Sequence, residues 1–113
     1  MTARTSDIVQ QIVDRGGDAD DVLRAAVAAL LDAPGVTWAA IALVEEGALR
    51  VGPAAGVADD AHRRRTPILF QGARVAELWV DGDLEQAQLD RIAAVVAPYA
   101  LIGWDTGGEA WDP

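Results

Sequence analysis

Residues 36–44 constrain the fold of this chain more than any other segment. They read Val-Thr-Trp-Ala-Ala-Ile-Ala-Leu-Val, so apolar residues occupy both sets of alternating positions. A β-strand directs alternate side chains to opposite faces of its sheet, and a strand that is apolar at both sets is typically covered on both faces. The segment therefore predicts a central strand whose two faces both need cover.

Two hairpins are predicted around this strand. The turn Glu45-Glu46-Gly47 leads to a return strand from Ala48 to Val51, which Gly52-Pro53 should break, and residues 54–61 read as a loop. A second hairpin joins a strand over residues 64–70 to one over residues 75–80. On that last strand Ala76, Leu78 and Val80 share one face, and Val75, Glu77 and Trp79 share the other.

Three segments have helical periodicity, and they begin near Ser6 or Asp7, near Asp18 or Asp20, and near Leu84. Gly16-Gly17 and Pro34-Gly35 should end the first two helices. Pro98 lies inside the third pattern and predicts a kink or an early end near Ala97. Because helices and hairpins follow one another without strand–helix alternation, the order indicates an α+β fold with a largely antiparallel sheet.

Length and composition narrow the class of protein. The 113 residues suit one domain, predicted here as residues 1–104 with a tail over residues 105–113. A net charge of −9 argues against nucleic acid and against anionic membranes as partners. No apolar run is long enough to span a membrane, and we predict a cytoplasmic protein. Cysteine is absent, which excludes disulfides, thiolate metal sites and cysteine nucleophiles.

Several stretches together resemble a GAF domain. Trp38 opens the first strand and Gly52-Pro53 follows the second, Thr66-Pro67 leads the third strand, and the fourth ends in Val80-Asp81. This order is similar to that of the GAF proteins that reduce free methionine-R-sulfoxide, and it covers most of the chain. The resemblance implies a four-stranded sheet in the order 2-1-4-3 with three helices on one face.

The chain departs from the GAF pattern between the two hairpins. GAF domains place a long segment there that covers the ligand pocket, whereas only seven residues separate Gly56 from Arg64. The reductases that the chain resembles carry their cysteines in that segment. We therefore expect a minimal GAF-like domain whose second sheet face takes its cover from a bound apolar ligand, from the C-terminal tail with Trp104 or Trp111, or from a second subunit.

The predicted ligand site lies on the face opposite the helices, where ligands bind in a GAF-like sheet. Glu77 and Trp79 share this face, and a tryptophan beside a carboxylate suits a cationic or aromatic molecule. The alternative is that Trp79 is a core or interface residue and that Glu77 pairs with an arginine such as Arg50 or Arg65. The candidate ligand-binding residues are Trp79, Glu77, Trp38 and Arg65.

The segment before the third strand contains two further groups of polar residues. His62, with Asp59 and Asp60, has ligand-type atoms, but three ligands within four residues of one loop rarely give a metal's geometry, so we predict a solvated loop and no metal. The run Arg63-Arg64-Arg65 is able to bind an anion. We interpret it instead as pairing with the chain's own acids and protecting an edge strand, with Arg64 on the face opposite its two neighbours.

These observations predict a non-catalytic GAF-like binding or regulatory module that acts as a homodimer and senses a small molecule. No nucleophile–base pair, metal set or cofactor loop is visible, so neither a catalytic residue nor a cofactor is predicted. The alternative is a roadblock-type dimeric regulator of a small GTPase. An apolar helical stripe is explained first by core packing and second by a helix-bundle dimer; it consists of Val22, Leu23, Ala26, Val27, Leu30 and Leu31.

Overall fold

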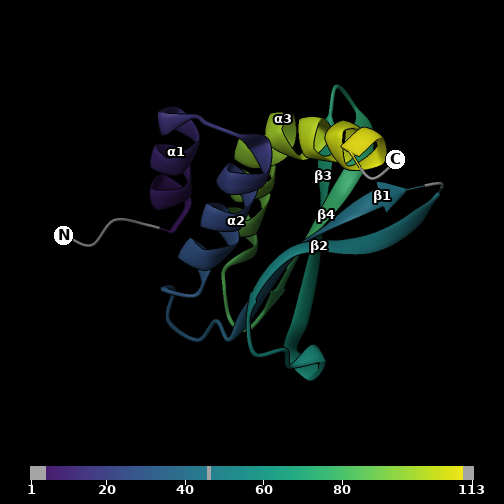
Figure 1. The fold of residues 1–113 in the computed structure, drawn as a ribbon. Coiled ribbons are helices and arrows are strands. Elements are labelled where there is room, and N and C mark those ends of the chain that lie inside the picture. The colour runs from purple at the N-terminus through teal and green to yellow at the C-terminus, as the bar shows by residue number, and fades with distance from the viewer. Residues whose placement is uncertain (1–4, 46, 111–113) are drawn as a thin grey trace.

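The computed structural model describes the backbone of residues 5–45 and 47–110 and the side chains of residues 5–44 and 47–100. Two helices precede two hairpins, and a long helix follows them (Figure 1). The elements are α1 (Thr5–Arg15), α2 (Ala19–Leu30), β1 (Trp38–Glu45), β2 (Ala48–Gly56), the short 3-10 helix η1 (Asp60–His62), β3 (Arg63–Phe70), β4 (Ala73–Asp81) and α3 (Gln86–Ala110).

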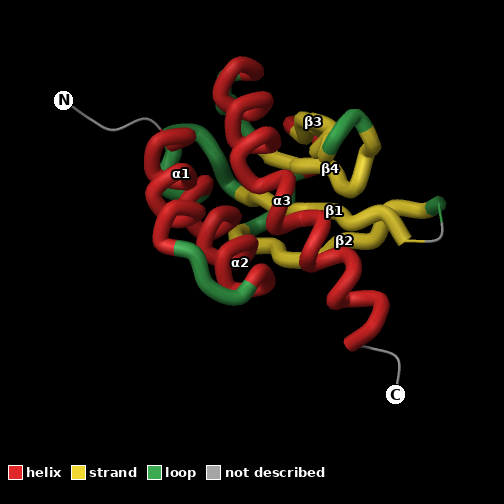
Figure 2. The backbone as a smooth tube through the Cα atoms, turned by 90° about the horizontal axis from the view of Figure 1, so that it is seen from above, coloured by secondary structure: helices red, strands yellow, loops and turns green. Residues whose placement is uncertain are grey.

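The four strands form one antiparallel sheet in the order β2-β1-β4-β3. This is the predicted order, and it places β1 in the interior of the sheet, as its apolar residues at both alternating positions indicate. The helices lie together on one face of the sheet (Figure 2). The fold is therefore α+β, with the strand order and the helix layer that the resemblance implies.

The hydrophobic core lies between this face and the helices. Ile41 of β1, Leu78 of β4 and Ile68 of β3 face the helices, and each is at most 1% exposed. The helices contribute Leu23, Val27, Leu30, Leu89, Ile92 and Val96 to the same cluster. Burial of apolar area from water is the main stabilising term in folding, so this layer carries most of the stability of the domain.

The helix ends follow local sequence signals, with one exception. Gly16 has a φ of 71°, a left-handed conformation that glycine adopts readily, and it follows the last residue of α1. Asp18 occupies the N-cap of α2 in an extended conformation. The expected early end at Pro98 is wrong, because α3 continues to Ala110. Figure 1 shows that α3 changes direction along its length, which is how a helix accommodates an internal proline.

Strand β2 is longer than predicted, because Gly52-Pro53 does not end it. Two residues of β2 lie opposite Ile41, between the pairs Ala40↔Ala54 and Ala42↔Val51, and the register shifts there. An edge strand accommodates a proline at such a bulge. A side chain at Gly52 would lie 3.1 Å from the Ile41 carbonyl oxygen, so glycine is favoured beside it.

A second register shift changes the face predicted for one residue of β4. It lies between Ile68 and Leu69 of β3, whose partners are Ala76 and Arg74. Val75 between those partners is only 9% exposed and belongs to the hydrophobic core, not to the face of Glu77 and Trp79 as predicted.

Over the described part of the chain, no helix has the length and apolar character needed to cross a membrane.

Candidate functional site

The sheet face turned away from the helices carries the candidate site, and we call it the open face. Three rows of paired residues cross it from β3 through β4 and β1 to β2. They are Arg63, Asp81, Trp38 and Gly56; Arg65, Trp79, Ala40 and Ala54; and Pro67, Glu77, Ala42 and Val51. The four predicted site residues thus lie on one face. None of the twelve belongs to the helix-facing hydrophobic cluster.

Arg63 lies at the β3 end of the first row and contacts several of the other site residues. Its Nε donates a hydrogen bond to Asp81 Oδ1 at 2.8 Å, and its Nη2 donates one to Asp81 Oδ2 at 3.0 Å. The guanidinium carbon also lies 4.4 Å from the centroid of the Trp38 ring and 5.5 Å from that of Trp79. The arginine therefore combines a bidentate ion pair with contacts to two aromatic rings, a combination that the planar guanidinium suits better than a lysine ammonium.

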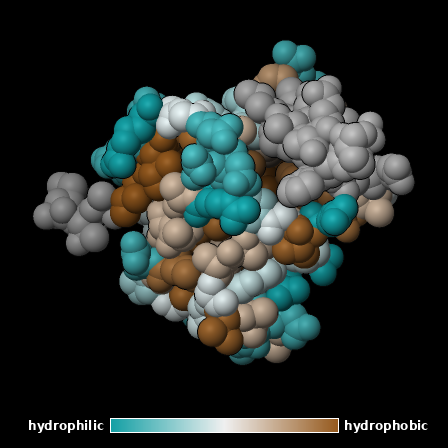
Figure 3. Space-filling view, in the orientation of Figure 1, coloured by the Kyte–Doolittle hydropathy of each residue, from teal (hydrophilic) through white to brown (hydrophobic). Residues whose placement is uncertain are grey.

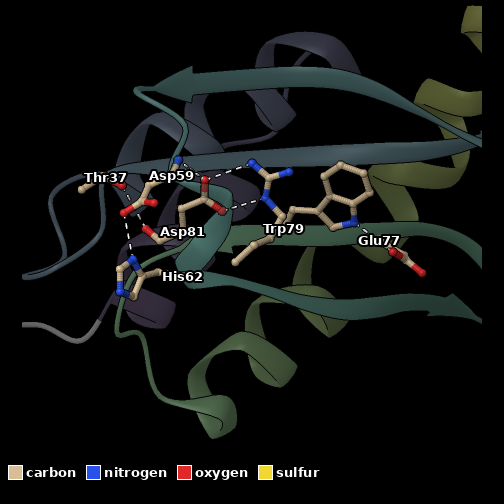
Figure 4. Close-up of polar contacts among 7 residues, drawn as sticks. Thr37, Asp59, His62, Glu77, Trp79 and Asp81 are labelled. Carbon is tan, nitrogen blue, oxygen red and sulfur yellow. Dashed lines mark hydrogen bonds and ion pairs between the residues drawn. The ribbon is translucent and has the colours of Figure 1, made fainter.

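Asp81 is the buried acid of the site, with no exposed surface. In addition to Arg63, it accepts a hydrogen bond from the backbone N–H of Asp59 at 2.6 Å (Figure 4). The hydrogen bonds from Arg63 are the largest cause of a pKa for Asp81 that lies below its ordinary value, and the Asp59 N–H and the charge of Arg63 lower it further, whereas burial opposes the shift. The sequence analysis noted Asp81 only as the last residue of its strand and did not select it as a site residue.

The indole ring of Trp79 in the second row contacts residues from both the second and the third row. Trp79 Nε1 donates a hydrogen bond to Glu77 Oε1 at 2.8 Å, and Arg74 Nη1 lies 3.1 Å from Glu77 Oε2. The guanidinium carbon of Arg65 lies 4.5 Å from the centroid of the same ring. Glu77 thus pairs with Arg74, which lies between the two strands predicted over residues 64–70 and 75–80, and the predicted partner Arg65 lies against the Trp79 ring instead.

These contacts change the kind of ligand that the face suits. The sequence predicted a cationic or aromatic molecule held over Trp79 beside a carboxylate. In the structure, Arg63 and Arg65 already lie against the tryptophan rings, and Glu77 and Asp81 already accept hydrogen bonds from arginines. The positions that would attract a cation are therefore filled by the chain's own guanidinium groups, which also provide part of the cover that we expected from elsewhere.

The sequence analysis also made predictions for Arg64 and His62, the other two basic residues near this site. Arg64 lies on the opposite face from its neighbours, as predicted, and donates a hydrogen bond to the Leu84 carbonyl oxygen at 3.1 Å. His62 Nδ1 lies 2.8 Å from Asp59 Oδ2, and this hydrogen bond raises the pKa of the exposed imidazole above its ordinary value. The described residues contain no group of three or more acids and histidines that could hold a metal ion.

Comparisons with known proteins support the fold and leave the family open. No protein-family model matches the sequence, and no curated protein matches it. The structure is similar to a free methionine-R-sulfoxide reductase of Staphylococcus aureus, solved in complex with its substrate, with a TM-score of 0.68 at 12% identity over 85% of this chain and 93% of that one. It is also similar to the type II enzyme of Thermoplasma acidophilum, with a TM-score of 0.61 at 16% identity over 87% of this chain and 95% of that one.

These neighbours overturn one expectation. The sequence analysis predicted that the chain is not an enzyme, yet both structural neighbours are reductases, so the fold gives no ground for that exclusion. The absence of cysteine suggests only the loss of cysteine-based activity. The resemblance to the GAF-like reductases, which was first drawn from the two hairpins, is confirmed at the level of the fold.

Proposed function

We propose that this chain is a GAF-like protein that binds a small molecule on the open face. The observation that carries the proposal is the pair Trp38 and Trp79, which remain half-buried on a face that no described helix covers. Large aromatic side chains at partly exposed positions provide contact area at little entropic cost, and arginine beside them adds directional donors. The two reductases with this fold are named for a free amino-acid derivative, which supports a ligand of similar size.

Tryptophan fluorescence tests the proposal directly. A variant with Trp104→Phe and Trp111→Phe retains Trp38 and Trp79 as the two reporters, because the chain has four tryptophans. We expect free methionine-R-sulfoxide, other amino acids or simple organic acids to change the emission in a saturable manner. Adding Trp79→Phe should remove most of the response. If every response persists unchanged in the Trp79→Phe variant, the site is wrong.

Homodimer formation is the second part of the proposal, and the structure changes the argument for it. The stripe on α2 that suggested a helix-bundle dimer is mostly inside the single chain, since Val22, Leu23 and Val27 are at most 3% exposed. In the view of Figure 3, brown hydrophobic patches are interrupted by teal hydrophilic residues. The support for a dimer now comes from exposed hydrophobic residues on the open face, such as Val51 and Leu69 at 49% and 50% exposure.

Light scattering coupled to size-exclusion chromatography measures the mass of the particle. We expect twice the chain mass of 11.9 kDa at high micromolar concentration. A monomer at that concentration would remove the dimer from the proposal and leave ligand binding to one chain. That ligand binding regulates the activity of this protein or of a partner stays a prediction.

A further inference from the structure

We propose that the open face binds an amphiphilic organic anion, with its charged group on Arg65 and its apolar part along the exposed side of β3. The inference rests on the proposed small-molecule site and names its ligand class. It follows from three features of the described residues: the ion pairs already made on this face, the contact of Arg65 with Trp79, and the apolar residues that follow Arg65 on its strand.

The first feature is the distribution of charge partners. Five charged side chains gather on this face from β3 and β4, and four of them pair with one another, Arg63 with Asp81 and Arg74 with Glu77. Among the described residues, Arg65 has no carboxylate within ion-pair distance. Arg15 and Arg64 also have no carboxylate partner among the described residues, but Arg15 belongs to α1 and Arg64 lies on the helix-facing side, so neither is part of this face. An external anion completes the set of partners.

The second feature is the support beneath Arg65. Its guanidinium carbon lies 4.5 Å from the Trp79 centroid, and the indole is itself held by the hydrogen bond that its Nε1 donates to Glu77. Among the described residues the Arg65 guanidinium has no hydrogen-bond partner, so its N–H donors are available, and they match the two oxygens of a carboxylate. Arg65 is itself exposed, so a ligand reaches these donors from solvent.

The third feature is an apolar strip on the same strand. Pro67 follows Arg65 by two residues and lies on the same face, since it pairs with Glu77. Leu69 pairs with Arg74, which contacts Glu77, and it is 50% exposed. At about 3.3 Å per residue, the strip from Arg65 to Leu69 is about 13 Å long, which fits a carboxylate with an extended apolar tail.

The test uses octanoate as the probe, with octanamide as its neutral counterpart and butanoate as its short counterpart. The uniformly ¹⁵N-labelled full chain is titrated at low salt, and the Trp79 indole N–H signal, assigned with Trp79→Phe, is followed by NMR. We expect octanoate to bind about tenfold more tightly than octanamide, since hydrogen bonds between charged groups are the strong ones. We also expect it to bind about tenfold more tightly than butanoate, because part of four additional methylene groups becomes buried.

Matched variants test whether Arg65 contacts the charged group of the ligand and Leu69 its apolar tail. Arg65→Gln should bring the ratio of octanoate to octanamide affinity close to one, whereas Arg15→Gln, which removes an exposed arginine from the last turn of α1, should leave that ratio unchanged. Leu69→Ser should weaken octanoate about fivefold and leave butanoate unchanged. Competition by inorganic phosphate would extend the ligand class to phosphate esters, and its absence would restrict the class to carboxylates.

Each contrary result has a separate meaning. Equal affinities of octanoate and octanamide, or equal losses in the Arg65→Gln and Arg15→Gln variants, would overturn the anion site and leave the proposed small-molecule function standing. Equal affinities of octanoate and butanoate would overturn the apolar strip. If neither these probes nor the amino acids of the fluorescence test affect Trp79, both this inference and the proposed function are wrong.

Discussion

The two faces of the sheet are built from the same four strands and differ in almost every physical respect. On β4, Leu78 faces the helices and is 1% exposed, while the adjacent Trp79 and Glu77 face away from them and are half-buried. The helix-facing side is a layer of aliphatic residues held by burial. The open face is a layer of tryptophan, arginine and carboxylate held by directional contacts. We therefore expect most of the stability to come from the helix-facing side and propose that binding uses the open face, so substitutions on the two faces should have different effects.

The largest effect on stability should come from the helix-facing side. Leu78→Ala removes a fully buried side chain and should lower the free energy of unfolding by about 3 kcal/mol, measured by urea denaturation. The matched open-face variant is Val51→Ala, at a position 49% exposed, which should cost less than about 0.5 kcal/mol. If Val51→Ala costs as much as Leu78→Ala, the open face is part of a buried core or interface.

A smaller effect is expected from the ion pair of the open face. Asp81→Asn removes the charge that Arg63 pairs with but keeps one acceptor oxygen, and it should cost about 2 kcal/mol because Asp81 is buried. Arg63→Gln tests the other partner. The double variant should cost less than the sum of the two single variants, since both remove the same interaction. Strict additivity would mean that the pair does not contribute as a unit.

The pH dependence of stability sharpens the same comparison. The pKa of Asp81 is lower in the folded protein than in the unfolded chain, where it is about 3.9. The charged form of Asp81 therefore stabilises the fold above about pH 4, and this contribution is lost as the pH falls through the folded pKa. The difference in unfolding free energy between the wild type and Asp81→Asn should be constant near neutral pH and shrink below about pH 4. A difference that does not change with pH would contradict the assigned shift.

The smallest expected effect concerns His62 at the edge of the open face. Asp59 raises the pKa of this exposed histidine, so its contribution to stability is complete below the unfolded value of about 6.5 and is lost as the pH rises through the folded pKa. An NMR titration of the imidazole should give a pKa above about 6.5, and Asp59→Asn should lower it. An unchanged pKa in that variant would show that the 2.8 Å contact with Asp59 is not maintained in solution.

The sequence predicted the layers of this fold better than their details. The alternation of Leu78 and Trp79, and of Arg64 with its neighbours, placed each side chain on its face because strand periodicity is fixed by backbone geometry. The length of β2 was not predictable from Gly52-Pro53, since the same dipeptide occurs at strand ends and at bulges. The position of Val75 also depended on a bulge that no local pattern marks.

The candidate site was only partly predictable for a related reason. Trp79 and Glu77 were found because they lie two residues apart on one strand. The pairing of Asp81 with Arg63 and the stacking of Arg63 on Trp38 depend on the register between β1, β3 and β4, which only the folded sheet defines. The terminal position of Asp81 on a strand that ends in Val-Asp was the one signal available, and by itself it did not distinguish a site residue from a surface acid.

The claim that binding belongs to the open face is tested most directly by mapping ligand-induced NMR shifts over the whole chain. With the amino acids and organic acids named above as ligands, the account predicts shifts in the Trp79 indole and in the methyl groups of Val51 and Leu69. The methyl groups of Ile41 and Leu78, which face the helices, should change little. Shifts concentrated on α1 and α2 with the open face unperturbed would contradict the account.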